Sequence, residues 1–231
     1  MVEIGPGAGA ITGILAPRAR RLVAIELDRE LAPRLRQQFA DRRSVEILET
    51  DVLTVDFNSL RDGQDRLMVI GNLPYYITSE ILLRLFRFHE AIARVVIMVQ
   101  REVADRIAAA PGTRDYGLLS ATAQIYAHVE RLLTLPPAAF MPPPEVHSTV
   151  LRLEMQPRFE ALGVKPEAFF AFLRQSFAQK RKTLAKNLRA AGFSAEAVVH
   201  AMAAANLPAT ARAEELGLEA MAAIWRGLSR P

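Results

Sequence analysis

Short apolar runs alternate with amphipathic segments along the first two-thirds of the chain. The apolar runs are bounded by Gly, Pro, Asn or charged residues and predict β-strands; they span 2–4, 22–25, 45–48, 67–71, 94–99, 129–135 and 148–153. Helical patterns lie between them, over 10–15, 78–88, 101–109 and 116–127. Because strands alternate with helices, we predict a mostly parallel sheet with helices on both faces.

The pattern changes after residue 155. Residues 156–166 have the proline and glycine content of a domain boundary. Beyond them only helical periodicity recurs, over 167–178, 182–190, 195–204 and 214–227. We therefore predict an α/β domain over residues 1–156, followed by a small all-α domain over 157–231. Its expected core is a set of apolar residues at helical intervals, for which base stacking is the alternative role: Phe169, Phe170, Phe172, Leu173 and Phe177.

Composition narrows the class of protein. The chain has no cysteine, which excludes disulfides and Cys-based metal sites, and its four histidines are too scattered for a metal-binding motif, so we expect no metal. No apolar run approaches the roughly 18 residues that cross a bilayer, and no signal-peptide pattern opens the sequence. We expect a soluble, cytoplasmic protein without a membrane partner, and a monomer.

Positive charge is concentrated in the last third. The net charge is +4; from Pro157 onward 11 Lys or Arg stand against 6 Asp or Glu, a net +5, and residues 1–156 carry the remaining −1. The run Lys180-Arg181-Lys182, with Lys186 after it, predicts contacts to an RNA phosphate backbone that weaken with salt. A solvated helix face is the alternative interpretation of such a run.

A glycine turn follows the first strand. Gly5-Pro6-Gly7-Ala8-Gly9 leads into the apolar helix at 10–15, which is typical of nucleotide-binding turns, where glycines allow a ligand to approach closely and leave the amides at the helix N-terminus free. The third glycine comes one residue earlier than in the G-x-G-x-x-G fingerprint, so the turn itself names no cofactor.

Carboxylates end the next two strands. Glu26 comes 17 residues after Gly9, where the second strand of such a fold places an acid against ribose hydroxyls. Asp51 follows the third strand. Ligands of open α/β sheets bind along this edge, although an acid in Asp51's position also serves as a helix cap.

The tetrapeptide Asn72-Leu73-Pro74-Tyr75 follows the fourth strand and suits a planar amino group. The carboxamide supplies an acceptor, the backbone before proline is extended, and the phenol ring offers a flat face. A strand that simply ends in a turn is the alternative, since Asn and Pro are common there.

These motifs, in this order, resemble those of S-adenosylmethionine-dependent methyltransferases with a Rossmann-like sheet. Together with the proline-rich stretch 139–150 and the basic run 179–188, they resemble the bacterial ribosomal RNA adenine dimethyltransferases over nearly the whole chain. The resemblance implies an antiparallel last strand and dimethylation of two adjacent adenines near the end of small-subunit RNA, within the pre-30S particle. It implies S-adenosyl-L-methionine as cofactor, held by Gly5, Gly7, Glu26, Asp51 and Asn72.

The expected chemistry follows from the substrate. Acceptors on the two amine hydrogens, the Asn72 side-chain oxygen and the Leu73 carbonyl, favour a pyramidal amine whose lone pair faces the methyl group. A flipped adenine needs new stacking partners. Tyr75 would supply one face and Phe140, fixed by the prolines after it, the other, so that the expected catalytic set is Asn72, Leu73, Pro74, Tyr75 and Phe140.

Two other functions fit the same motifs. One is a non-catalytic RNA-binding factor of ribosome assembly that keeps the fold; the other is a large-subunit RNA adenine dimethylase, whose motif more often contains Ile in place of Leu73. Members of the family carry a further segment before the glycine turn that closes over the cofactor, whereas this sequence opens inside the first strand. We therefore expect weak cofactor binding by this chain.

Overall fold

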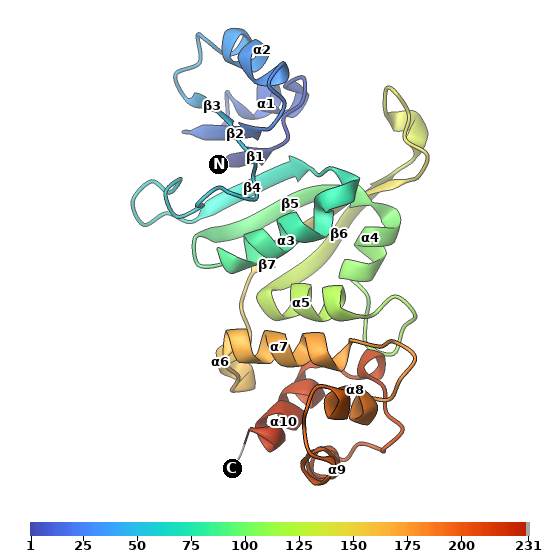
Figure 1. The fold of residues 1–231 in the computed structure, drawn as a ribbon. Coiled ribbons are helices and arrows are strands. Elements are labelled where there is room, and N and C mark those ends of the chain that lie inside the picture. Colours follow the sequence, from blue (N-terminus) through green and yellow to red (C-terminus); the bar gives the residue numbers. More distant parts are fainter. Residues whose placement is uncertain (230–231) are drawn as a thin grey trace. The chain divides into compact units, whose positions relative to one another are not determined.

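The computed structural model describes residues 1–229, apart from the side chain of Tyr75 (Figure 1). It divides into two compact units. The sheet unit comprises Met1–Ala104 and His128–Met155, and the helical unit comprises Asp105–Ala127 and the chain from Gln156 onward. The helical unit thus takes in a stretch, Asp105–Ala127, that the sequence pattern places with the sheet.

Seven strands of the described residues form one sheet in the order β3-β2-β1-β4-β5-β7-β6. Their bounds are β1 Val2–Ile4, β2 Leu22–Glu26, β3 Val45–Glu49, β4 Leu67–Asn72, β5 Ile92–Gln100, β6 Ala127–Leu135 and β7 Ser148–Met155. The pairs among β1 to β5 are parallel, and β7 runs antiparallel to β5. The Rossmann-like sheet and the antiparallel strand are therefore confirmed.

Strands β1 and β2 are buried on both faces, whereas β4 and β5 alternate between buried and more exposed residues. Every residue of β2 is buried, and β5 has four fully buried aliphatic residues along its length. The strand order reverses between β1 and β4, and such a switch point creates a crevice at the carboxyl ends of the strands. The glycine turn after β1 and the tetrapeptide that begins at the end of β4 both lie at this crevice.

The helices of the sheet unit connect these strands (Figure 1). They are α1 Ala10–Leu15, α2 Leu31–Gln38, α3 Thr78–Arg87 and α4 Arg101–Ile107, with the 3-10 turns η1 Tyr75–Ile77 and η2 Pro137–Ala139; α4 continues into the helical unit at Asp105. The sequence pattern did not predict α2. That helix buries only Ala32 and Leu35, and the Asp28 side chain ahead of it accepts hydrogen bonds from the backbone N–H groups of Glu30 and Leu31.

The helical unit contains α5 Leu118–Tyr126, α6 Phe159–Leu162, α7 Pro166–Ser176, α8 Leu184–Ala190, α9 Ala195–Ala204, the 3-10 turn η3 Ala213–Glu215 and α10 Leu218–Leu228. Two expectations are wrong here. The expected linker contains α6, which buries Phe159 and Leu162, and the helix expected over 214–227 is interrupted after η3, so that α10 begins at Leu218.

The core of the helical unit includes Phe169, Phe172 and Leu173, each at most 2% exposed. Phe177 packs against this core, and Phe170 is half-buried. The core prediction is confirmed for the three buried residues, which burial also removes from any stacking role. α5 packs into the same core through Ala121 and Ile125, and this explains why Asp105–Ala127 belongs with the helical unit.

Candidate active site

The glycine turn uses its own amides to hold its shape. The N–H groups of Gly5, Gly7 and Gly9 donate to Ile25 O at 3.0 Å, Glu26 Oε2 at 3.1 Å and Pro6 O at 2.9 Å. The amides of these three glycines are therefore occupied within the protein. Their role lies in the backbone path, because all three have positive φ angles.

Gly9 also allows two helices to meet. It precedes α1 at φ +82, and a Cβ there would lie 2.9 Å from Leu35 Cδ2 and 3.1 Å from the Phe39 ring. A side chain at this position would therefore push α1 away from α2. The early third glycine of the motif serves helix packing.

Glu26 ends β2 and is 8% exposed. Its Oε1 accepts a hydrogen bond from Asp28 N at 2.9 Å and its Oε2 from Gly7 N at 3.1 Å. These two bonds fix the orientation of the carboxylate and tie it to the glycine turn. A carboxylate has about four lone-pair sites, so capacity remains for two ligand hydroxyls.

Asp51 follows β3 and is half-buried. Its Oδ1 accepts a hydrogen bond from Leu53 N at 2.9 Å, so it stabilises the local turn, as the capping alternative predicts. It also lines a cavity of about 330 Å³ together with Glu26 and Gly5. The walls of this cavity are mainly aliphatic: Ile4, Ile25, Leu27, Val52, Ile77 and Ile81. The volume and the few polar groups are typical of a small-molecule site.

A second cavity, of about 560 Å³, contains the tetrapeptide and the proline-rich loop. Asn72, Leu73, Pro74 and Phe140 line it together. It shares Gly5, Glu26, Asp28 and Pro74 with the first cavity. The structure thus brings the sequence-predicted residues around two adjoining spaces; the Tyr75 side chain lies outside the described residues.

Hydrogen bonds and the burial of Leu73 attach the tetrapeptide to the end of β4. Leu73 N donates to Met98 O of β5 at 3.1 Å, and the Leu73 side chain is 2% exposed. The Pro74 carbonyl accepts from Thr78 Oγ1 at 3.0 Å. Asn72 is exposed and lines the second cavity.

Glu3 is a buried residue that the sequence analysis did not single out. It is 1% exposed in β1, and its Oε2 accepts a hydrogen bond from the hydroxyl of the fully buried Thr12 at 2.7 Å. Burial raises the pKa of Glu3, and hydrogen bonds from the Thr12 side chain and backbone partly oppose this. The pair ties β1 to α1 across the glycine turn. An acid between two apolar strand residues is the signal that could have revealed it.

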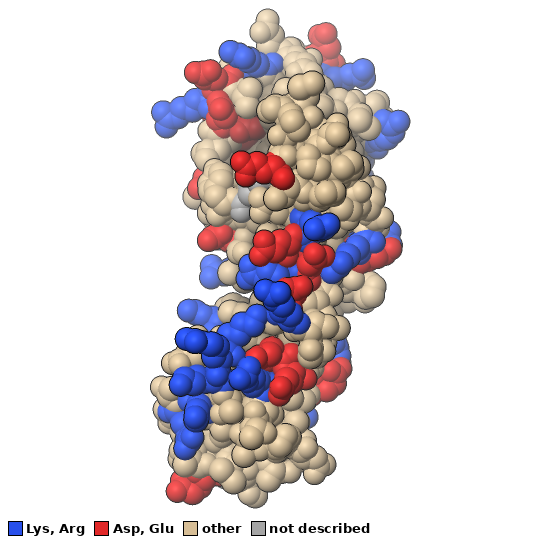
Figure 2. Space-filling view, turned by 90° about the vertical axis from the view of Figure 1, so that its right-hand side faces the viewer, with Lys and Arg blue, Asp and Glu red and all other residues tan. Residues whose placement is uncertain are grey.

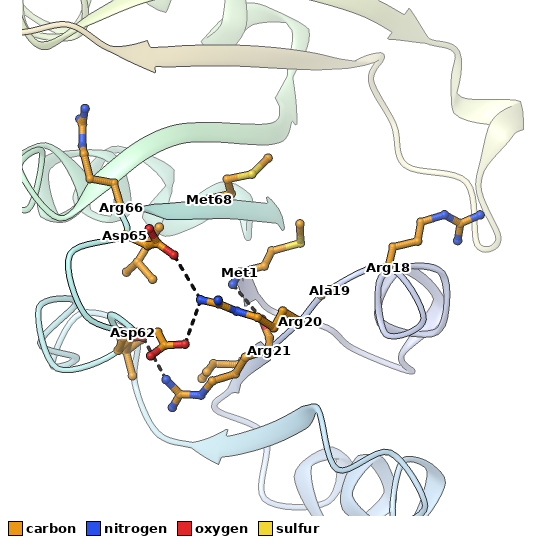
Figure 3. Close-up of a pocket in the computed structure, with 12 residues that line it drawn as sticks. Met1, Arg18, Ala19, Arg20, Arg21, Asp62, Asp65, Arg66 and Met68 are labelled. Atoms are coloured by element: carbon orange, nitrogen blue, oxygen red, sulfur yellow. Dashed lines mark hydrogen bonds and ion pairs between the residues drawn. The ribbon is translucent and has the colours of Figure 1, made fainter.

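Another pocket lies at the amino ends of the strands (Figure 3). Figure 3 shows Arg20 directed at Asp62 and Asp65, with nitrogen–oxygen distances of 2.9 and 3.2 Å. One guanidinium here faces two carboxylates and all three side chains are exposed, and such pairs contribute about 0–1 kcal/mol to stability. Because ligands of parallel sheets bind at the opposite edge, this pocket is not the candidate site.

The predicted RNA-contacting cations belong to the helical unit. Lys180, Arg181 and Lys182 are exposed in the loop between α7 and α8, and Lys186 is exposed on α8. In the lower half of the space-filling view, Lys and Arg side chains gather over the helical unit (Figure 2). Among the described residues no group of His, Asp or Glu is arranged to hold a metal ion, and no helix is long and apolar enough to span a bilayer.

Comparison with known sequences gives a consistent result. A model of the ribosomal RNA adenine dimethylase family matches residues 1–224. Ribosomal RNA small subunit methyltransferase A of Acidobacterium capsulatum is 64% identical, over 99% of this chain and 81% of the relative. The protein of the same name from Koribacter versatilis is 55% identical, over 100% of this chain and 85% of the relative.

Comparison with solved structures supports the fold. A dimethyladenosine transferase from Plasmodium falciparum has a TM-score of 0.77 at 21% identity, covering 96% of this chain and 87% of that one. The 23S rRNA methyltransferase ErmE has a TM-score of 0.72 at 24% identity, covering 99% and 90%. At these identities the likeness establishes the architecture.

Proposed function

The chain belongs to the ribosomal RNA adenine dimethylase family, and we propose that it dimethylates the exocyclic amines of two adjacent adenines near the 3′ end of small-subunit ribosomal RNA. It is an S-adenosylmethionine-dependent rRNA adenine-N6,N6-dimethyltransferase. The observation that carries the proposal is that Glu26, Asp51, Asn72 and Phe140 line two adjoining cavities in a chain that the family model covers over residues 1–224.

The first cavity fits S-adenosylmethionine. Its aliphatic walls suit an adenine ring, and its two carboxylates suit ribose hydroxyls and the adenine amino group. Glu26 would accept from the ribose hydroxyls and Asp51 from the amino group, while Gly5 and Gly7 keep the backbone path close to the amino-acid portion. When bound, the cofactor supplies an activated methyl group on sulfur.

The second cavity fits the target adenine. An adenine amine is a weak nucleophile because its lone pair is shared with the ring. The Asn72 side-chain oxygen and the Leu73 carbonyl would accept the two amine hydrogens and so favour the pyramidal form. The proton that leaves the amine passes to water, because the two carbonyl oxygens accept hydrogen bonds but are too weakly basic to keep a proton, and no His or Lys is among the described residues that line the two cavities.

Stacking would hold the extruded base. Phe140 lies at the same cavity as Asn72 and would cover one face of the ring. Tyr75, which follows Pro74, would cover the other. Replacing the stacking lost on base flipping lowers the cost of taking the adenine out of its RNA context, which amounts to a few kcal/mol.

The helical unit would supply affinity for RNA. Its net charge of +5 from Pro157 onward comes from exposed cations such as Lys180–Lys182 and Lys186. Such contacts are independent of sequence, so they hold the enzyme on the RNA while the sheet unit selects the adenine. We propose that the chain acts as a monomer in the cytoplasm, on the pre-30S particle, and contributes to its maturation.

The test is methyl transfer from labelled S-adenosylmethionine to small subunits that lack the modification. Large subunits and fully modified small subunits serve as controls. The proposal expects label in small-subunit RNA alone. Label in large-subunit RNA would show the wrong ribosomal target, and binding without label would show a non-catalytic assembly role.

A further inference from the structure

The loop that joins α7 to α8 presents three adjacent cations to solvent. Lys180, Arg181 and Lys182 are all exposed, and the loop extends only from Phe177 to Thr183. Adjacent like charges repel one another. A loop without a fixed conformation would therefore lose conformational entropy each time it bound a phosphate backbone. The geometry of this loop therefore bears directly on RNA affinity.

The buried side-chain amide of Asn187 anchors this loop. Asn187 of α8 is 4% exposed, and its Nδ2 donates to Ser176 O at 2.7 Å and to Gln179 O at 3.2 Å. Ser176 is the last residue of α7, where backbone carbonyls lack helical partners, and Gln179 directly precedes Lys180. A single side chain thus joins the end of α7 and the start of the basic run to α8.

Further contacts complete the path of the loop. Lys182 N also donates to Gln179 O, at 3.0 Å, so the backbone turns tightly around the first two cations. Lys180 Nζ donates to Arg114 O at 2.9 Å, on the loop before α5. An ammonium has three donors, so this contact orients Lys180 and leaves two N–H groups for other acceptors.

The stability of α8 does not account for Asn187. Asn is a poor helix former, and a buried amide is costly unless it is hydrogen-bonded. The neighbouring helix residues Leu184 and Leu188 are fully buried, so an apolar side chain suits this surface. What only a side-chain amide provides here is a pair of donors to two carbonyls of the preceding segment.

We propose that Asn187 is a positioning residue for RNA: it fixes the 177–183 loop so that Arg181 and Lys182 meet neighbouring phosphates together. The inference rests on the proposed RNA-binding role of the helical unit and adds to it a residue that never touches RNA. An unanchored loop would present the same charges in many arrangements, few of which engage both cations at once.

Asn187→Ala tests this in the full chain, with Ser176→Ala as a matched control. Ser176 is fully buried at the same end of α7 and its Oγ donates to Phe172 O at 2.8 Å, so its loss disturbs the core without removing the loop's anchor. Binding of a small-subunit RNA fragment is measured over a range of salt concentrations, at a temperature where every variant is folded. Amide hydrogen exchange over 177–183 reports the order of the loop.

We expect Asn187→Ala to weaken RNA binding about 5- to 10-fold and to lower the salt slope by roughly one, the equivalent of about one phosphate contact. Exchange should accelerate over 177–183, and Ser176→Ala should change neither quantity. Equal effects of the two variants, or an unchanged slope with Asn187→Ala, would overturn the proposal. If Asn187→Ala does not fold, Asn187→Ser, which keeps one donor, takes its place with the same criteria.

The double variant Arg181→Ala/Lys182→Ala tests the RNA site separately from the role of Asn187. If this double variant leaves the salt slope unchanged, the loop does not bind RNA and the proposed function loses its RNA site. If it flattens the slope while Asn187→Ala does not, the RNA site stands and the role of Asn187 is wrong.

Discussion

Replacing Glu26 by alanine removes two kinds of hydrogen bond, those proposed to the cofactor and those to the protein backbone, and their effects can be measured separately. The carboxylate is proposed to accept two ribose hydroxyls, and it already accepts N–H groups from Gly7 and Asp28. Loss of the charge-assisted bonds to the cofactor should cost about 1.5–3 kcal/mol, which weakens Kd about 10- to 150-fold. Loss of the two backbone contacts should cost about 1 kcal/mol each in stability, because both amides can be hydrated.

The matched control is Glu49→Ala. Glu49 lies beside Glu26 in the register of β2 and β3, but its carboxylate pairs with Arg36 at 2.9 Å and is 35% exposed. That pair contributes about 0–1 kcal/mol, and cofactor binding should remain that of the unmodified protein. Glu26→Gln, which keeps one acceptor oxygen, should fall between Glu26→Ala and the unmodified protein.

Titration calorimetry with S-adenosylmethionine gives the affinities, and thermal unfolding of the same samples gives the stabilities. A Glu26→Ala protein that binds the cofactor within about twofold of the unmodified protein would refute the ribose assignment. Equal weakening by Glu49→Ala would show instead a general effect of charge at this sheet edge.

Three further variants test other parts of the structure. Replacing Lys180–Lys182 by alanine should weaken RNA binding for all sequences and lower the salt slope by up to about one per lost phosphate contact; an unchanged slope would mean that these side chains face solvent in the complex. Burial raises the pKa of Glu3 in the folded protein above its ordinary value of 4.5. The protonated carboxyl therefore adds to the stability of the fold, fully at pH values below 4.5, and this contribution is lost as the pH rises through the folded pKa. Glu3→Gln should therefore gain melting temperature relative to the unmodified protein between pH 4.5 and neutral pH, and a pH-independent difference would contradict this. Tyr75→Phe should reduce methyl transfer mildly and Tyr75→Ala severely; equal losses would show that the hydroxyl matters more than the ring.

Apolar runs bounded by turn residues made the strands of the sheet predictable from sequence. A strand such as β2, whose residues are all buried, appears as an uninterrupted apolar run, and its carboxyl end is marked by Glu26. The direction of β7 could not be predicted in this way. Its apolar pattern predicts a strand but not a direction, and the antiparallel pairing with β5 followed from the family resemblance.

The packing contacts between helices and strands were harder to predict than the helices and strands themselves. The periodicity of α5 identifies its buried face, but both units offer an apolar surface, and only the structure shows Ile125 in the core of the helical unit. α2 was missed because it buries only two residues and contains Pro33. The same limit applied to the candidate site. Predicted residues such as Glu26, Asp51 and Asn72 line adjoining cavities. The bond from Gly7 N to Glu26 and the Glu3–Thr12 contact, in contrast, depend on geometry that spacing does not encode.

The most direct test is nucleoside analysis of small-subunit RNA after incubation with S-adenosylmethionine and either the unmodified protein or Asn72→Ala. Mass spectrometry of the digested RNA should show N6,N6-dimethyladenosine formed by the unmodified protein. At saturating cofactor and RNA, Asn72→Ala should form this product roughly two to three orders of magnitude more slowly, the usual effect of losing one preorganised polar group. An Asn72→Ala rate close to that of the unmodified protein, or a methylated product other than an adenine amine, would contradict the proposed mechanism.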